Sequence, residues 1–348
     1  MSFFGVTVEK IKEVLSIEGA DRIEIARLDG MDYQFVIGKG QFKSGESVLY
    51  IPVDSVVPDD VLAKLGLEGK LAGSKRNRVK TIKLRGQISQ GIVADSMLVP
   101  PETREAGTEA ITKCLGVEKY IPPEVPCHNA ILRGLPDAVP VYDIESADRN
   151  LDVVKKLMNQ KVMITEKVEG TNFSLLHAAD GEIMVNQHHK TIIPKEGVEH
   201  TFWKVAHDQD ILGFAKALSL DYPKQDVLIY GEMLGPGIQK NIYKLSSYEV
   251  LFFDIMVNRE WMDSQRFMDA VTGFYGDAKK AVPVLCIGVE LSAWLGGRTI
   301  KEASNGVSSL RDGLREGVVI KPMQEQRDST LGRLFLKQRS PEYLAKEK

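Results

Sequence analysis

Residues 164–176 read ITEKVEGTNFSLL, and this stretch organises the rest of the chain. Apolar residues at both ends bracket a polar centre that contains Lys167, Glu169 and Gly170. The pattern is typical of two half-buried strands joined by a tight loop, which would hold Lys167 at the edge of a pocket. A lysine amine attacks phosphorus only when it is neutral, and partial burial with a nearby metal ion favours that form. We therefore interpret Lys167 as a nucleotide-accepting lysine, the alternative being a surface lysine beside a turn glycine.

The bulk composition indicates an ordinary globular protein. The chain has 348 residues, of which 43% are hydrophobic and 27% charged, and a formal net charge of −3. This length suffices for a sizeable core and predicts two domains. Any nucleic-acid partner must bind a local basic patch, because the chain is not basic overall. The start MSFFGVTVEKIKEV lacks a signal-peptide pattern and no run approaches about 18 apolar residues, so we expect neither secretion nor a membrane span.

The three cysteines, Cys114, Cys127 and Cys286, are odd in number and far apart. This spacing fits a reducing compartment such as the cytoplasm and argues against a disulfide framework.

Residues 1–110 have the composition of a small β-barrel. Strand-like runs at 35–37 and 48–53 are separated by turn material at 43–46, and Pro58 opens a short helix that ends at Leu65. Six cations without an intervening acid then form a basic stripe: Lys75, Arg76, Arg78, Lys80, Lys83 and Arg85. Such a stripe binds phosphate backbones with little sequence information, the alternative being a strand edge protected by lysines.

The proline-rich stretch from Pro100 to Pro140 predicts an interdomain connection. We place the boundaries at 1–110 for a nucleic-acid-binding domain, 111–140 for a linker and 141–348 for a catalytic domain.

The remainder of the chain mixes helices and strands. Helical periodicity is present from Asp148, at 211–218 and at 267–274, and strand-like runs occupy 227–233, 248–257 and 317–321. Helices among non-alternating, antiparallel-type strands argue for an α+β fold. The helical stripes, including Phe214 and Phe274, are expected to be core.

Several charged residues follow strand ends or loops in a way that suits a magnesium–nucleotide site. They are Lys167, Glu232, Glu316, Lys321 and Lys337. Glutamates accept metal-bound water or ribose hydroxyls, and lysines neutralise phosphate oxygens. Taken singly, each could instead be a surface salt bridge.

Five motifs resemble, in order, the nucleotidyltransferase motifs of ATP-dependent polynucleotide ligases and capping enzymes. They are KVEGTN at 167–172, IYGEM at 229–233, FFDIM at 252–256, EGVVIK at 316–321 and LKQR at 336–339. The finer match is to nick-sealing RNA ligases with an N-terminal OB domain. It rests on TEKVEGTNF at 165–173, GEMLGPGIQ at 231–239 and KQRSPEYL at 337–344, with ADRIEI at 20–25 and YIPVDS at 50–55 resembling the leading domain.

The resemblance implies an N-terminal OB-like barrel followed by an adenylyltransferase domain of antiparallel sheets and flanking helices. It also implies roles for three groups of residues. The catalytic group is Lys167, which would carry covalent AMP, together with Lys337 and Arg149. The ATP-binding group is Glu166, Gly170, Asn172, Glu232, Phe253, Lys321 and Arg339, with Glu232 on the ribose and Phe253 stacked on adenine or, alternatively, in the core. Glu316 and Glu232 would hold Mg²⁺ or Mn²⁺.

One segment departs from the family pattern. The family usually has an arginine after the strand that follows the lysine motif, but residues 186–190 here read NQHHK. Lys190 or a histidine would substitute, or the register is shifted.

The predicted function is an ATP-dependent RNA ligase that seals 3′-hydroxyl and 5′-phosphate ends through lysyl-AMP. Its expected partner is a nicked duplex with RNA on the 3′-hydroxyl side, in RNA repair, without an evident obligate protein partner. The alternatives are an ATP-dependent DNA ligase, a capping guanylyltransferase or an inactive nucleic-acid-binding scaffold. The first two normally carry a trailing OB domain, whereas this sequence ends eleven residues after Lys337.

Overall fold

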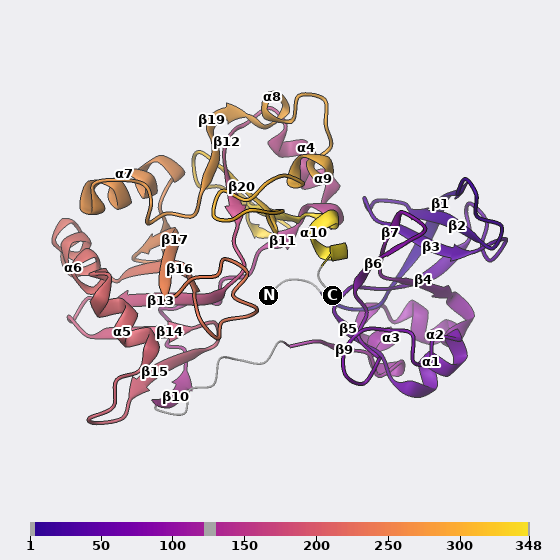
Figure 1. Ribbon diagram of the computed structural model, residues 1–348, viewed down its shortest axis with the longest axis horizontal. Helices are drawn as coiled ribbons and strands as arrows, with labels where there is room; N and C mark the ends of the chain where they lie inside the picture. The colour runs from indigo at the N-terminus through magenta and orange to yellow at the C-terminus, as the bar shows by residue number, and fades with distance from the viewer. Residues whose placement is uncertain (1–3, 122–129, 347–348) are drawn as a thin grey trace. The chain divides into compact units, whose positions relative to one another are not determined.

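The computed structural model describes residues 4–121 and 130–346, which form two compact units (Figure 1). The N-terminal unit contains residues 4–121, 146–154 and 340–346. The C-terminal unit contains residues 130–145 and 155–339.

The N-terminal unit is built on a five-stranded antiparallel sheet in the order β3-β2-β1-β4-β8. Strand β1 (Thr7–Ser16) pairs with β4 (Ser47–Ile51) through its first half and with β2 (Ile23–Leu28) through its second half. The register shifts between Ile11 and Glu13, and such a bulge bends a strand so that it can serve both partners. Every residue of β4 after Ser47 is buried, because its alternate residues face two separate clusters of apolar side chains. The arrangement agrees with the predicted barrel.

The remaining elements of this unit are short. They are β3 (Gln34–Gly38), β5 (Ser55–Val56), α1 (Asp59–Leu65), β6 (Thr81–Leu84), β7 (Gln87–Gln90), β8 (Ile92–Asp95), the 3₁₀ helix Ser96–Leu98, α2 (Pro101–Glu105), α3 (Thr108–Cys114), β9 (Glu118–Lys119), the 3₁₀ helix Ala147–Arg149 and α10 (Pro341–Lys346). Helix α4 (Leu151–Leu157) contains residues of both units.

The C-terminal unit contains two antiparallel sheets. The seven-stranded sheet has the order β10-β15-β14-β13-β16-β17-β18, and the five-stranded sheet has the order β11-β23-β20-β12-β19. The strands are β10 (Ala130–Gly134), β11 (Glu145–Ser146), β12 (Lys161–Lys167), β13 (Thr171–His177), β14 (Ile183–Gln187), β15 (Lys190–Pro194), β16 (Val227–Leu234), β17 (Glu249–Val257), β18 (Glu260–Trp261), β19 (Val284–Glu290), β20 (Gly317–Pro322) and β23 (Leu336–Arg339), with the small pair β21 (Arg327–Asp328) and β22 (Gly332–Arg333).

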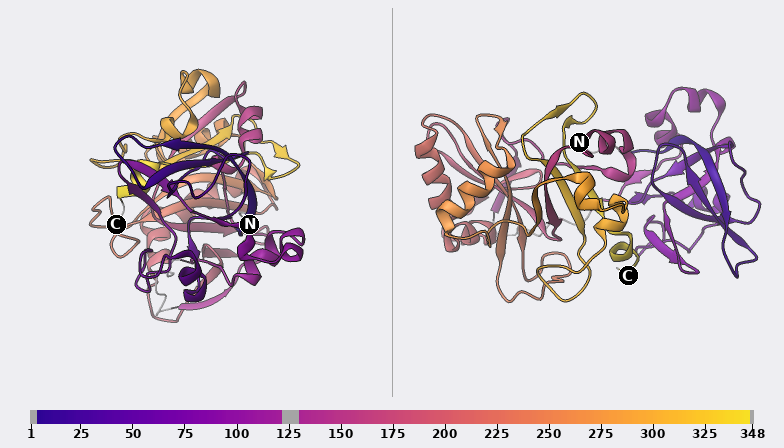
Figure 2. Two further views of the ribbon diagram at one scale, coloured as in Figure 1. Left: turned by 90° about the vertical axis from the view of Figure 1, so that its right-hand side faces the viewer. Right: turned by 90° about the horizontal axis from the view of Figure 1, so that it is seen from above.

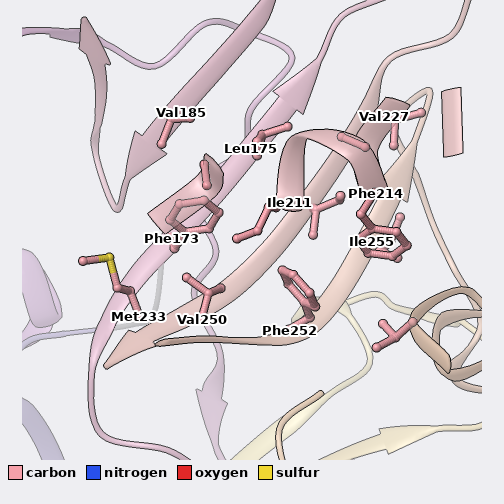
Figure 3. Packing of buried hydrophobic residues seen from close by; sticks show 14 of the residues in the cluster. Phe173, Leu175, Val185, Ile211, Phe214, Val227, Met233, Val250, Phe252 and Ile255 are labelled. Atoms are coloured by element: carbon pink, nitrogen blue, oxygen red, sulfur yellow. The ribbon is translucent and has the colours of Figure 1, made fainter. Parts of the chain in front are cut away.

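Three helices, α5 (Thr201–Asp208), α6 (Ile211–Asp221) and α7 (Ser264–Tyr275), cover one face of the seven-stranded sheet (Figures 1 and 2). Figure 3 shows Ile211 of α6 beside Phe173 of β13, and Phe214 of α6 beside Ile255 of β17. The stripe predicted for α6 is therefore core. In α7, Phe274 is 36% exposed at the rim, although its ring still contacts Phe214 at a centroid distance of 5.2 Å. Helices α8 (Leu291–Leu295) and α9 (Ile300–Ser304) follow β19.

The stretch 164–176 passes from one sheet to the other. Its first strand, β12, lies between β20 and β19 in the five-stranded sheet, and its second strand, β13, is the central strand of the seven-stranded sheet. The predicted strands are present, but they do not pair with each other. Residues 168–170 therefore form the connection between the sheets, and Lys167 is the last residue before it.

The division of the chain differs from the predicted boundaries. Residues 111–117, which we assign to the linker, are part of the N-terminal unit, because Ile111, Leu115 and Val117 belong to one of its core clusters. Ala130–Gly134 forms a strand with β15, and residues 146–154 and 340–346 belong to the N-terminal unit although we assigned them to the catalytic domain. Residues 122–129 of the predicted linker lie outside the described residues. No helix among residues 4–121 and 130–346 is both long and apolar enough to span a membrane.

Candidate active site

Lys167 and Glu316 form the centre of the site. Lys167 ends β12 opposite Gly317, the first residue of β20, so Glu316 lies directly before the paired position. The Nζ atom of Lys167 is 2.7 Å from Oε1 and 2.8 Å from Oε2 of Glu316. The lysine side chain is 25% exposed and the glutamate side chain 10%, so both side chains are largely sheltered from solvent.

Strand register places two more cations on the same face of this sheet. Gly317 pairs with Lys167 on one side and with Arg339 on the other, and Val319 pairs with Lys337. Residues two apart in a strand share a face, so the side chains of Lys167, Lys337 and Arg339 leave the sheet on one side. Gly317 permits this close pairing, because a Cβ there would lie 2.1 Å from the carbonyl oxygen of Gln338.

The charge state of Lys337 reflects this crowding. Burial, reinforced by the positive charges of Arg339 and Lys167, lowers the pKa of Lys337 to about 8, against the opposing influence of Asp143 and Glu316. Three neighbouring cations are costly when they face one another, so this face favours a polyanionic ligand.

Glu232 approaches from the seven-stranded sheet. It pairs with Asn172 across β16 and β13, so the two side chains are neighbours on one face. Burial raises the pKa of Glu232 to about 7, and the negative charges of Glu316 and Glu169 act in the same direction. The charge of Lys167 and a hydrogen bond from the Gly170 backbone oppose this increase.

The loop between the two strands requires glycine at 170 because of close packing. A Cβ on Gly170 would lie 2.5 Å from the Met233 carbonyl oxygen and 2.8 Å from Cγ of Glu232. The Glu169 amide donates to the Tyr243 hydroxyl at 2.9 Å, and Nε2 of Gln239 donates to the Gly170 carbonyl at 3.3 Å. These contacts hold the loop beside β16.

Phe253 is the extra residue of a β-bulge. Tyr230 pairs with Asp254 whereas the next residue, Gly231, pairs with Phe252, so Phe253 has no opposite partner. Phe253 is half-buried, and its ring lies 4.7 Å from that of Tyr142 and 6.2 Å from that of Tyr230. Part of the ring therefore remains available for a ligand.

Lys321 does not join the Lys167 cluster, contrary to the prediction. Its side chain leaves the sheet on the same face as that of Lys167. However, Lys321 lies four residues beyond Gly317, the residue that pairs with Lys167, which is about 13 Å further along β20. Its buried Nζ is 3.0 Å from the Asp254 carboxylate. Asp254 also accepts hydrogen bonds from Arg333 and from the Tyr142 hydroxyl, each at 2.6 Å, and Arg333 is bound by Glu325.

Sequence reasoning missed this buried network of Asp254, Lys321, Arg333, Glu325 and Tyr142. An acid in the middle of the apolar run FFDIM was the available signal, because a charge in a buried strand requires a partner. The network joins β17 of one sheet to β20 of the other.

Glu166 was predicted to bind the nucleotide, but its carboxylate faces away from Lys167. Successive residues of a strand point to opposite faces, and Glu166 is buried on the back of the sheet. There it accepts hydrogen bonds from the Ser308 hydroxyl at 2.5 Å and from the Ser309 amide at 2.8 Å.

The residues of the unusual segment 186–190 have different environments in the structure. Asn186 is fully buried, bound to Ser174 and Thr191. His188 and His189 form the turn between β14 and β15, and Nε2 of His188 is 3.7 Å from the Asp143 carboxylate. Lys190 begins β15 and is exposed. His188 thus contacts Asp143, whose negative charge acts on the pKa of Lys337.

Arg149 and the basic stripe belong to the N-terminal unit. The Arg149 guanidinium lies 5.3 Å from the centre of the Tyr50 ring. Arg78 is bound by Asp54 at 2.6 Å and stacks on Tyr120 at 3.4 Å, so it has a structural role. Exposed side chains of the stripe are those of Lys75, Arg76, Lys83 and Arg85, whereas Lys80 is half-buried.

The acidic residues of the site fit a divalent cation that is shared with a ligand. No three His, Cys, Asp or Glu side chains gather into a metal-binding group within the described parts of the chain. Magnesium is commonly held by one or two carboxylates, several waters and substrate phosphates. Glu232 and Glu316, near the cations that suit phosphate, match that requirement.

Comparisons with known proteins agree with this geometry. A family model described as RNA ligase matches residues 160–338, just over half of the chain, and an OB-fold domain model matches residues 5–96. A comparison with curated proteins gave no match.

Solved structures of one RNA ligase are similar over nearly the whole chain. Naegleria gruberi RNA ligase with PPi has 25% sequence identity and a TM-score of 0.81, with 98% of each chain covered. A lysine-to-alanine mutant of that ligase with ATP and Mn has 25% identity and a TM-score of 0.79, with 99% of each chain covered. A lysine-to-methionine mutant with AMP and Mn has 24% identity and a TM-score of 0.80, with 98% of each covered. Because the family model spans the segment that carries Lys167, Glu232 and Glu316, the chain belongs to the RNA ligase family.

Proposed function

We propose that this RNA ligase uses ATP and a divalent cation to seal 3′-hydroxyl and 5′-phosphate ends, most readily at nicks, through a covalent AMP on Lys167. The observation that carries the proposal is the partly sheltered Lys167 amine, 2.7 Å from Glu316, on the sheet face that also bears Lys337 and Arg339. Similar ligase structures with ATP and Mn, and with AMP and Mn, support the choice of nucleotide and metal.

In the first step Nζ of Lys167, after losing a proton, attacks the α-phosphorus of ATP. A phosphorus–nitrogen bond forms, and the bond to pyrophosphate breaks. Lys337 and Arg339 would stabilise the charge that builds on the phosphate oxygens. Glu232 and Glu316 would hold Mg²⁺ or Mn²⁺, which supplies further neutralisation of phosphate charge when bound. Asn172 lies beside Glu232, where it would bind the AMP phosphate.

In the later steps AMP leaves Lys167 for a 5′-phosphate end, and a neighbouring 3′-hydroxyl displaces it to form the phosphodiester. Phe253 is proposed to stack on adenine, because the bulge leaves its ring half-buried beside Tyr142. Lys321 and Glu166 have no direct role in this proposal, since each is bound elsewhere. Arg149 keeps the role near the reacting phosphates that the resemblance implies.

The proposed partner is a nicked duplex with RNA on the 3′-hydroxyl side. The support is the hairpin of β6 and β7, which presents Lys83 and Arg85 to solvent. Positive φ values of 48° at Arg85 and 81° at Gly86 are typical of a type I′ turn, which projects the tip of the hairpin. Cations at such a tip bind phosphate backbones.

The test is incubation with magnesium and ATP labelled at the α-phosphate, followed by denaturing electrophoresis. We expect a labelled band near 38.7 kDa for the wild type and none for Lys167→Met. Lys216→Met, an exposed lysine of α6, serves as the control and should label normally. Protein first stripped of AMP with pyrophosphate that still gives no band would contradict the mechanism and favour the binding scaffold.

Two comparisons separate the related activities. Labelling with GTP in place of ATP would indicate a capping guanylyltransferase. Sealing of nicked DNA with no preference for RNA on the 3′-hydroxyl side would indicate a DNA ligase. We expect ATP to label the protein and RNA on that side to be required.

A further inference from the structure

The loop before Glu316 is held from the back of the sheet by Glu166. Lys167 and Glu166 are neighbours in β12, and their side chains leave opposite faces. The buried Glu166 carboxylate uses one oxygen for the Ser308 hydroxyl at 2.5 Å and the other for the Ser309 amide at 2.8 Å. Hydrogen bonds to a charged acceptor are stronger than neutral ones, so this contact is a firm anchor.

Arg315 makes a second anchor, directly beside Glu316. Its guanidinium donates to the carbonyls of Ala303 at 2.7 Å, Ser304 at 3.0 Å and Asn305 at 3.0 Å, which end helix α9. The negative charge of Glu166 favours the charged guanidinium, against the burial that lowers the pKa of Arg315. A Cβ on Gly306 would lie 2.9 Å from that guanidinium, so glycine provides the space.

The loop between these anchors is closed by its own backbone. The Ser308 amide donates to the Gly313 carbonyl at 2.8 Å, and the Arg315 amide donates to the Gly306 carbonyl at 3.0 Å. Residues 306–315 therefore form a braced loop whose end sets the position of Glu316. Displacement of Ser308 would be transmitted along this loop to the Glu316 carboxylate.

We propose that Glu166 is a positioning residue that holds the loop 306–315 so that Glu316 meets Lys167 on the opposite face of the sheet. The inference rests on the proposed covalent chemistry at Lys167. In this proposal Glu166 helps to set the geometry in which Lys167 attacks ATP, and it does not bind the nucleotide. Displacement of a reacting group by about 1 Å can slow an enzymatic step a hundredfold. We therefore expect loss of the Glu166 contact to slow the transfer of AMP to Lys167.

The experiment measures enzyme–AMP formation in a single turnover over a range of ATP concentrations, with wild type, Glu166→Gln and Ser308→Ala. Glutamine keeps the shape of the side chain and removes its charge, and alanine removes only the Ser308 hydroxyl. We expect the rate at saturating ATP to fall about tenfold for Glu166→Gln and about threefold for Ser308→Ala. The ATP concentration for half-maximal rate should change less than twofold, because neither group contacts ATP in this proposal.

The matched control is Asp226→Asn, which alters another carboxylate that accepts a backbone amide, that of Ala179 at 2.8 Å. It should label at the wild-type rate. A Glu166→Gln protein that melts at lower temperature but labels at the wild-type rate would overturn the inference. The inference would also be overturned if this variant bound ATP more weakly but kept the wild-type rate at saturating ATP. If Glu166→Gln does not fold, Ser308→Ala decides by the same criteria. Loss of labelling in the wild type itself would instead reject the proposed function.

Discussion

At the residue scale, Glu232 makes a sharp prediction about pH. Burial raises the pKa of its carboxyl from 4.5 in the unfolded chain to about 7 in the fold. A raised pKa means that the folded protein binds the proton more tightly, so the stability from the protonated acid is complete below pH 4.5 and is lost as pH rises toward 7. We expect Glu232→Gln, which stays neutral, to gain about 2 kcal/mol relative to the wild type between pH 5 and pH 8.

Urea unfolding at pH 5, 6, 7 and 8, without ATP or divalent metal, checks this prediction. Other titrating groups are common to both proteins and cancel in the difference. If the stability difference between wild type and Glu232→Gln is the same at every pH, Glu232 is ionised throughout this range. Glu232 would then have no proton to release when a cation binds.

At the scale of elements, the two sheets of the C-terminal unit are joined by a buried charge. Asp254 of β17 is fully buried, 3.0 Å from Lys321 of β20 and 2.6 Å from Arg333. Asp254→Asn would leave two buried cations without their shared counter-charge, so we expect it to lower the free energy of unfolding by about 3 kcal/mol. Urea titration of the folded enzyme measures this loss.

The control for this prediction is Asp277→Asn. Asp277 is exposed and accepts a hydrogen bond from the Lys279 amide at 2.8 Å. The side-chain oxygen of asparagine can accept the same hydrogen bond. It should leave the urea midpoint unchanged. If both variants unfold at the wild-type midpoint, the Asp254 network does not stabilise the junction between β17 and β20.

At the scale of the whole molecule, binding of nucleic acid should separate from adenylylation. Lys83→Ala and Arg85→Ala remove charges from the exposed tip of the β6–β7 hairpin. We expect each to weaken binding of a nicked RNA duplex and to reduce the slope of log affinity against log salt by about 1, while enzyme–AMP formation is unchanged. Fluorescence anisotropy at several salt concentrations measures the slope.

Lys113→Ala, an exposed lysine of α3 in the same unit, is the control of equal charge. A loss of affinity as large as that of the hairpin variants would indicate a general charge effect. Wild-type affinity and salt slope in the hairpin variants would place the duplex elsewhere.

The sequence by itself determined the local features of this protein. Strand periodicity predicted β12, β13, β16 and β20, and the helical stripe predicted the buried face of α6, because both patterns depend on residues close in sequence. The order of the motifs predicted an RNA ligase, which the family model confirms. Lys167, Glu232, Glu316 and Lys337 were singled out by residue type and Arg339 by the resemblance. The structure brings Lys167 together with Glu316 and places the remaining three around them.

Only the tertiary structure decided which side of each strand meets which partner. Lys167 and Glu316 are 149 residues apart, and their contact depends on the register of β12 against β20. Because successive side chains of a strand point to opposite faces, Glu166 lies on the back of the sheet. Lys321 pairs with Asp254, although the motifs grouped both Glu166 and Lys321 with Lys167. A shift of one residue in register reverses every side chain, and a pKa depends on neighbours in space, so neither can be obtained from residue identity alone.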